Sequence, residues 1–136
     1  MTDMQTDAQS VVVERELAHP PEKVWRALTQ PHLMQEWLAK TDFRPQVGHR
    51  FDLPFDWGRV DCEVLVVEPH RTLTYTWTSG ALDSVVTWTL TGTEAGTRLR
   101  LEQTGFPTGE PRYLMGARMG WPRFFDGIET VLARPD

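Results

Sequence analysis

Asp61 and Glu63 lie two residues apart in a segment that alternates between apolar and polar positions. On an extended strand they would share one face, and paired carboxylates can divide acid and base roles when burial separates their pKa values. Their neighbours Val60, Cys62 and Val64 are apolar, which predicts that the opposite face is the buried one. We therefore expect both carboxylates to be solvated and paired with arginines across strands, and we predict no catalytic residue.

Cys62 is the only cysteine of the sequence, which excludes an internal disulfide and a cysteine-built metal site. The charges of Asp61 and Glu63 beside it would raise the pKa of its thiol, whereas a reactive cysteine needs a lowered pKa. We predict that Cys62 is a small buried residue. Ser79 and Ser84 have no base nearby in the sequence and no G-x-S-x-G motif, so a nucleophilic serine is not indicated either.

The histidines and glycines give no sign of a metal or a cofactor. The four histidines lie in separate segments, and none follows the spacing of a metal site. The glycines are scattered and form neither a G-x-G-x-x-G motif nor a phosphate-binding loop. We therefore predict no metal and no cofactor.

Large rings are frequent, with six Trp, six Phe and two Tyr in 136 residues. Most should fill a core, but several could line a pocket of ~300–1,000 Å³ with a few polar anchors. The candidate ligand-binding wall residues are Trp37, Phe51, Tyr75, Trp77, Trp88, Met115, Trp121 and Phe125. Met115 is included because a flexible thioether suits a wall that adapts to its ligand. Trp57, close to a strand end, is a candidate for the rim.

The helices and strands that must position these residues can be predicted from the spacing of apolar residues and from the prolines. Residues 11–17 (VVVEREL) begin with β-branched side chains and predict a first strand. Pro20-Pro21 opens a short helix, which Pro31 ends before a second short helix begins. From Gly48 onward the apolar period is two, which predicts five strands joined by short turns in an antiparallel meander.

After Pro107 the period returns to that of a helix, with one apolar stripe from Leu114 to Leu132. Pro122 inside it predicts a bend or a restart of the helix. The stripe must be buried against the ring-rich face of the sheet. We predict an α+β helix-grip fold, in which a curved antiparallel sheet of six to seven strands wraps around a long C-terminal helix. Three arginines fall off the stripe and are either solvated or placed at a pocket mouth to meet a ligand carboxylate: Arg112, Arg118 and Arg123.

Length and composition bound the remaining possibilities. A chain of 136 residues fits one domain, which we place at residues 11–134, after a disordered tail at residues 1–10. The net charge of −5 argues against a nucleic acid or an anionic membrane as a partner. No apolar run approaches the roughly 20 residues that span a bilayer, and the first residues lack the pattern of a signal peptide. A cytoplasmic location is the expectation.

Five stretches of the sequence carry a family resemblance: HPPEKVWRALTQPHLMQEWL, FRPQVGHRFDL, GRVDCEVLVVEPHRTLTYTW, SVVTWTL and MGWPRFFDGIETVL. In this order they resemble the START-like (SRPBCC) superfamily, and more narrowly bacterial homologues of the C-terminal domain of activators of the heat-shock chaperone ATPase. The resemblance implies a hydrophobic cavity between the sheet and the C-terminal helix. Members of the superfamily bind lipids, polyketides or other apolar molecules, and some catalyse cyclisation.

These observations favour a protein that binds a small hydrophobic molecule in that cavity. One alternative is an enzyme of the polyketide cyclase or dehydratase type, which would need a polar group inside the cavity. Another is a chaperone-interaction module, which the resemblance to the activators suggests. A monomer and a homodimer are both compatible with the sequence.

Overall fold

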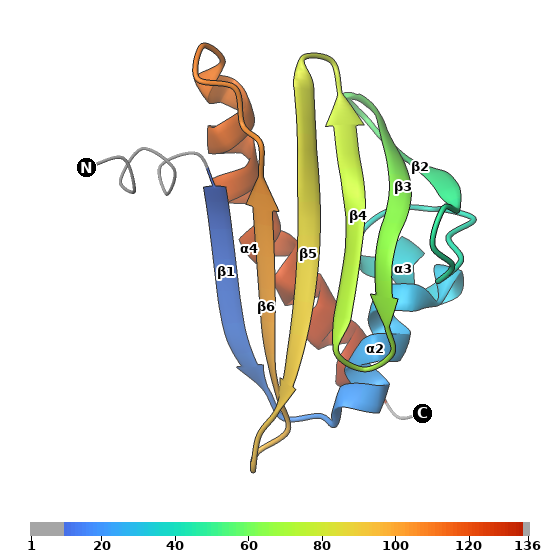
Figure 1. The fold of residues 1–136 in the computed structure, drawn as a ribbon. Helices are drawn as coiled ribbons and strands as arrows, with labels where there is room; N and C mark the ends of the chain where they lie inside the picture. The colour runs from blue at the N-terminus through green and yellow to red at the C-terminus, as the bar shows by residue number, and fades with distance from the viewer. Residues whose placement is uncertain (1–9, 135–136) are drawn as a thin grey trace.

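The computed structural model describes residues 10–134, and these form three helices and six strands. In chain order they are β1 (Ser10–Leu17), α2 (Pro21–Thr29), α3 (Pro31–Trp37), β2 (Arg50–Phe55), β3 (Gly58–Glu68), β4 (Thr72–Ser79), β5 (Leu82–Gly92), β6 (Thr97–Thr104) and α4 (Pro111–Leu132). Figure 1 shows the sheet in front of α4, with α2 near the lower end of the sheet and α3 about halfway along it. Of the tail predicted at residues 1–10, only Ser10 lies within the described residues, where it begins β1.

The six strands form one antiparallel sheet with the order β1-β6-β5-β4-β3-β2. From β2 to β6 each strand pairs with the next one along the chain, as the short turns in the sequence predict. β1 pairs with β6, which brings the first and last strands together. The predicted α+β fold, with an antiparallel sheet and two short helices after the first strand, is confirmed.

Alternation along the strands decides which face of the sheet is buried. In β5 the side chains of Leu82, Ser84, Val86, Trp88 and Leu90 are buried, and the residues between them are more exposed. The period of two places all the buried side chains on one face of the pleated strand. The buried face is therefore the one that meets α4.

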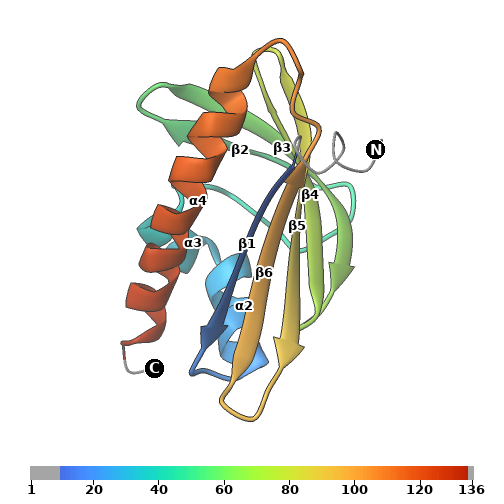
Figure 2. The same ribbon diagram turned by 90° about the vertical axis from the view of Figure 1, so that its left-hand side faces the viewer.

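α4 lies against this buried face and runs along the sheet (Figure 2). Its buried residues include Trp121, Phe125 and Ile128, which recur at the spacing of one helix face. The helix continues through Pro122 and does not restart there. Pro122 has no N–H to donate to the carbonyl of Arg118, so the helix loses one hydrogen bond at this point.

The centre of the core is a cluster of rings around Trp88, which is fully buried. The ring of Trp88 lies 5.7 Å from that of Trp37, 5.6 Å from that of Trp121 and 5.6 Å from that of Phe125. The first two pairs are edge-to-face, the arrangement that places the positive edge of one ring on the negative face of the other. β5, α3 and α4 meet at this cluster.

α3 approaches α4 closely because position 127 is a glycine. A Cβ atom at Gly127 would lie 2.9 Å from the Cβ atom of Trp37. The indole N–H of Trp37 donates to the carbonyl of Ala27 at 2.8 Å, which ties α3 to α2. The two short helices are thereby fixed beside the second half of α4.

Arg15 joins the edge strand β1 to α4. Its guanidinium donates to Asp126 and to Glu129, each at 2.7 Å, and to the carbonyl of Pro122 at 3.2 Å. It also lies 5.5 Å from the centre of the Phe125 ring. A charged residue at an inward-facing position is satisfied here because the two carboxylates of α4 reach it.

Among residues 10–134, no helix is long and apolar enough to cross a membrane.

Candidate functional site

A cavity of about 510 Å³ lies between the first half of α4 and the sheet. The β2–β3 and β4–β5 hairpins and Gln103 of β6 contribute the sheet side of it. Its volume falls within the ~300–1,000 Å³ of small-molecule sites. It is lined by Phe55, Trp57, Trp77, Ser79, Leu82, Gln103, Arg112, Tyr113, Gly116, Ala117, Gly120, Trp121 and Phe124.

The helix side of this cavity has very small residues at its middle, between Arg112 and Tyr113 at one end and Trp121 and Phe124 at the other. Gly116, Ala117 and Gly120 all line it, and they occupy one and the same stretch of α4. A Cβ atom built at Gly116 or at Gly120 meets no atom within 4 Å. Space remains between helix and sheet at this point because the helix carries almost no side-chain volume there.

The walls of the cavity are aromatic. The ring of Trp121 lies 5.2 Å from that of Trp77 and 5.3 Å from that of Phe124. At the outer end, Phe55 and Trp57 stack with their ring centres 5.2 Å apart and their planes 7° from parallel. Trp57 is 66% exposed, which places it at the rim, where the sequence suggested it. Flat walls of this kind suit a planar ligand.

The floor of the cavity carries a chain of buried hydrogen bonds. The indole N–H of Trp121 donates to the side-chain oxygen of Gln103 at 2.7 Å, and the Gln103 amide donates to the Ser84 hydroxyl at 2.9 Å. The hydroxyl donates in turn to the carbonyl of Trp77 at 2.7 Å. Because each partner is satisfied by the next, an uncharged amide can lie 1% exposed in an apolar core.

Sequence reasoning missed Gln103, although a signal was present. Gln103 follows Leu99 and Leu101 on the same face of β6, so it is a polar residue at an inward-facing position of an otherwise apolar pattern. Ser84 occupies the equivalent place before Val86 on β5. A polar residue that breaks a buried alternation predicts a buried hydrogen-bond partner.

The mouth of the cavity carries the charged side chain of Arg112. Its guanidinium donates to the hydroxyl of Tyr113 at 3.2 Å, lies 4.8 Å from the centre of that ring, and approaches the Glu110 carboxylate at 3.5 Å. The Tyr113 hydroxyl also accepts the N–H of Ala81 at 3.1 Å, which fixes the ring to the β4–β5 turn. Gly80 makes this approach possible, since a Cβ atom there would lie 2.8 Å from the same hydroxyl.

The predicted wall residues are divided between the cavity and the core. Trp77 and Trp121 line the cavity. Trp37, Trp88 and Phe125 lie behind Trp121, in the ring cluster around Trp88.

The other three predicted wall residues lie away from the lining. Phe51 and Tyr75 pack edge-to-face on Phe43, which comes from the segment between α3 and β2 and fills the space beside them. Met115 is 59% exposed on the outer side of α4, one residue before Gly116. A helix turns by about 100° per residue, so neighbouring positions face different directions.

Two titratable groups are buried in the dense part of the sheet. Burial raises the pKa of the Tyr75 phenol, and the hydrogen bond from Trp88 opposes this rise only in part. Burial also raises the pKa of the Cys62 thiol, and the charges of Asp61 and Asp52 add to the effect. Cys62 is therefore a buried protonated thiol, as the sequence predicted.

The two carboxylates considered for catalysis lie on the solvated face of β3. Glu63 pairs with Arg50 on the neighbouring strand at 3.6 Å. Asp61 pairs with Arg59 of its own strand at 3.4 Å, where the sequence predicted a partner across strands. No group of three or more histidine, cysteine or carboxylate side chains that could hold a metal ion occurs among residues 10–134.

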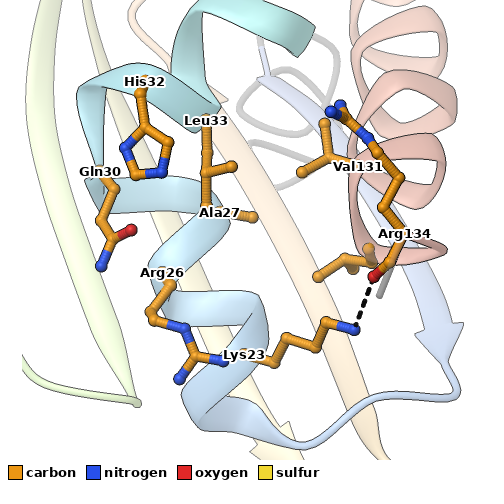
Figure 3. Close-up of a pocket in the computed structure, with 9 residues that line it drawn as sticks. Lys23, Arg26, Ala27, Gln30, His32, Leu33, Val131 and Arg134 are labelled. Carbon is orange, nitrogen blue, oxygen red and sulfur yellow. Dashed lines mark hydrogen bonds between the residues drawn. The ribbon is translucent and has the colours of Figure 1, made fainter. Parts of the chain in front are cut away.

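A second cavity, of about 490 Å³, lies at the other end of α4 (Figure 3). It is lined by Lys23, Arg26, Ala27, Gln30, His32, Leu33, Val131, Leu132 and Arg134. The Lys23 amine donates to the carbonyl of Arg134 at 3.4 Å, and the Arg134 guanidinium contacts Glu36 of α3. These contacts hold the end of α4 against α2 and α3. Within the described part of the chain, the lining of this second cavity includes three basic side chains and no phenylalanine, tyrosine or tryptophan ring, so the ring-lined cavity is the better candidate for binding an apolar ligand.

The chain matches one family model, that of Activator of Hsp90 ATPase homolog 1-like protein, over residues 18–133. The matched range contains every described element except β1, and so includes all the residues that line the ring-lined cavity. Among curated proteins no match to this chain was found.

Solved structures share the fold over nearly the whole chain. Protein MLL2253 from Mesorhizobium loti is 57% identical, with a TM-score of 0.90 over 93% of this chain and 98% of that chain. CalU16 from Micromonospora echinospora is 25% identical, with a TM-score of 0.79 over 91% of this chain and 76% of that chain. DynU16, from the dynemicin biosynthetic locus, is 27% identical, with a TM-score of 0.80 over 91% of this chain and 47% of DynU16.

Proposed function

The chain belongs to the family of Activator of Hsp90 ATPase homolog 1-like proteins, and from this premise we propose that it binds a small apolar molecule in the ring-lined cavity. One observation carries the proposal. α4 lacks side-chain volume at Gly116 and Gly120, in a cavity that tryptophan and phenylalanine rings also line. Unfilled space of this size inside an ordered fold costs dispersion energy, and a ligand that fills it recovers those contacts.

The expected affinity follows from the apolar area that a ligand loses to water. A two-ring aromatic molecule that buries about 300 Å² of its surface gains roughly 7 kcal/mol at ~25 cal/mol per Å², before the cost of ordering. A gain of this size corresponds by itself to a dissociation constant of about 7 μM, so after the cost of ordering we expect a value on the order of 10 μM to 1 mM.

The chemistry of the lining favours binding over acid–base catalysis. Among residues 10–134, the polar side chains that line the cavity are Ser79, Gln103, Arg112 and Tyr113, without a histidine or a carboxylate. General acid–base catalysis by a cyclase or dehydratase ordinarily uses such groups. The similarity to DynU16, from a biosynthetic locus, supports a small molecule as the partner. A role in chaperone interaction stays a prediction from the family name alone.

Filling the cavity from the helix side tests the proposal. We would titrate wild-type protein with N-phenyl-1-naphthylamine, an uncharged two-ring probe, and compare the Gly120→Leu variant. The leucine side chain enters open space, so the fold should persist while the dissociation constant rises at least tenfold. Gly109→Leu is the matched control, since a Cβ atom there also meets nothing within 4 Å and Gly109 does not line the cavity.

The binding of the probe to these three proteins distinguishes the cavity from other binding sites. Saturable binding to the wild type and to Gly109→Leu, lost in Gly120→Leu at a thermal midpoint no lower than that of the wild type, supports the cavity as the site. Equal binding by all three proteins, or no saturable binding by the wild type, contradicts the proposal.

A further inference from the structure

The charge of the lining restricts what the cavity can take. Among residues 10–134, Arg112 is the one permanently charged side chain that lines it, and no carboxylate does. Arg112 lies at the mouth, next to Tyr113, whereas the floor is formed by the uncharged Gln103 and the indole of Trp121. A charged group on a ligand therefore has a favourable place at one end of the cavity only.

The floor offers little to a charge. The oxygen of the Gln103 amide already accepts the indole N–H of Trp121, and its nitrogen already donates to Ser84. A charge buried there would lose its hydration without full compensation, which is costly in an apolar interior. The buried end of a ligand should therefore be an uncharged ring.

Arg112 at the mouth is held by its neighbours and is still accessible to a ligand, since its side chain is 71% exposed. Tyr113 holds the guanidinium of Arg112 through its ring and its hydroxyl, and the hydroxyl is itself fixed by the N–H of Ala81. Such a side chain loses little further freedom when a ligand binds. Glu110 occupies one side of the guanidinium at 3.5 Å, but five N–H donors leave room for a second acceptor.

We propose that the ligand is a planar aromatic molecule with one anionic group, whose rings lie in the cavity against Trp77 and Trp121 and whose carboxylate or sulfonate binds Arg112. This inference rests on the proposed function and adds a chemical class and an orientation to it. Glu110 competes with the ligand anion for the same guanidinium. Its removal should therefore strengthen the binding of anions and leave the binding of neutral rings unchanged.

Two probes that differ by a single group provide the test. 8-Anilino-1-naphthalenesulfonate has the skeleton of N-phenyl-1-naphthylamine with a sulfonate added. In fluorescence titrations, Arg112→Gln should weaken binding of the sulfonate about tenfold and change binding of the neutral probe by less than twofold. Arg112→Lys should restore part of the loss, because it keeps the charge without the planar fork. Glu110→Gln should tighten binding of the sulfonate two- to fivefold.

Arg118→Gln is the matched control, since Arg118 is an exposed arginine of the same helix and does not line the cavity. If Arg112→Gln weakens both probes equally or neither, or if Arg118→Gln weakens the sulfonate as much, the anion site is refuted. In those cases Gly120→Leu still excludes the neutral probe and the proposed function stands. If Gly120→Leu leaves binding of both probes unchanged, the proposed function fails and the anion site fails with it.

Discussion

The two halves of α4 meet the same sheet in opposite ways. In residues 121–132, Phe125 and Ile128 are completely buried, and Phe125 packs on Trp88 of β5. Residues 111–120 contribute Gly116 and Gly120 to an open cavity. One amphipathic helix therefore completes the core with residues 121–132 and borders an open cavity with residues 111–120.

The difference arises from the elements beside the helix. α2 and α3 both contact α4. α2 lies toward the end of the sheet where α4 terminates, and α3 lies about halfway along the sheet (Figures 1 and 2). At the other end α4 faces the hairpins that carry Trp57 and Leu82, without a further helix beside it among the described residues. No sheet residue among those described lines the second cavity, which lies among α2, α3 and the end of α4, so it does not separate α4 from the sheet. Between helix and sheet, the layer is filled beside α2 and α3 and stays open where α4 covers the sheet alone.

The glycines of α4 show the same contrast at single positions. Gly127 lacks a side chain because the backbone of α3 occupies the place where the side chain would lie. Gly116 and Gly120 lack side chains at places that no protein atom occupies. The first two of the following predictions test this contrast directly.

The largest effect is expected from Phe125→Ala in the dense half. Phe125 is fully buried against Trp88, so the variant loses the transfer energy of the ring and leaves a cavity, at a cost of about 3–5 kcal/mol. The comparison variant is Phe55→Ala, a half-buried ring that already borders open space, for which we expect about 1–2 kcal/mol. Urea unfolding of the two variants and the wild type measures both losses in the free energy of unfolding. Equal losses would show that the two halves are packed alike.

The fold was predictable because periodicity records which face of an element is buried. The alternation in residues 50–104 and the helical stripe after Pro107 each identify one apolar face, and two amphipathic layers have few ways to combine. The segment between α3 and β2 has no such period, so the sequence could not place Phe43. That ring takes the space beside Phe51 and Tyr75, which pack on it and away from the cavity.

The cavity itself was only partly predictable. Trp77 and Trp121 were selected as large rings at mid-element positions, and both line it. Gly116 and Gly120 carry no hydrophobic signal, and their contribution is an absence of volume that exists only once helix and sheet are placed together. Nothing in the one-dimensional pattern distinguishes Gly120 from Gly127, although their surroundings are opposite.

The same substitution at those two glycines should change stability in opposite directions. At Gly127 an added methyl group meets Trp37 at 2.9 Å and must displace α3, which we expect to cost about 1–3 kcal/mol. At Gly120 it meets nothing, and alanine favours a helix over glycine by ~1 kcal/mol, so the variant should be more stable. The thermal midpoints of Gly127→Ala and Gly120→Ala, compared with that of the wild type, test this prediction. Destabilisation of both would mean that the cavity half is also closely packed.

The smallest effect concerns alkaline pH and belongs to the dense region alone. Burial raises the pKa of the Tyr75 phenol, so the folded protein keeps this proton where the unfolded chain, with a pKa of about 10, releases it. The contribution of the buried phenol to the free energy of unfolding is fully present below about pH 10. As the pH rises above this value, the free energy of unfolding falls by up to ~1.4 kcal/mol per pH unit. Burial of the Cys62 thiol adds a fall that begins near pH 8.5 and is common to the wild type and any Tyr75 variant.

Tyr75→Phe isolates the phenol from these other contributions. The variant keeps the ring but removes the acceptor of the Trp88 indole N–H, at 3.0 Å, which should cost about 1 kcal/mol at neutral pH. Above about pH 10 only the wild type continues to lose stability through the phenol, so the two unfolding free energies should converge as the pH rises. Urea titrations at pH 7, 9, 10 and 10.5 measure this. Curves that stay parallel up to pH 10.5 would mean that the phenol titrates alike in both states, and that the ring cluster is open to water.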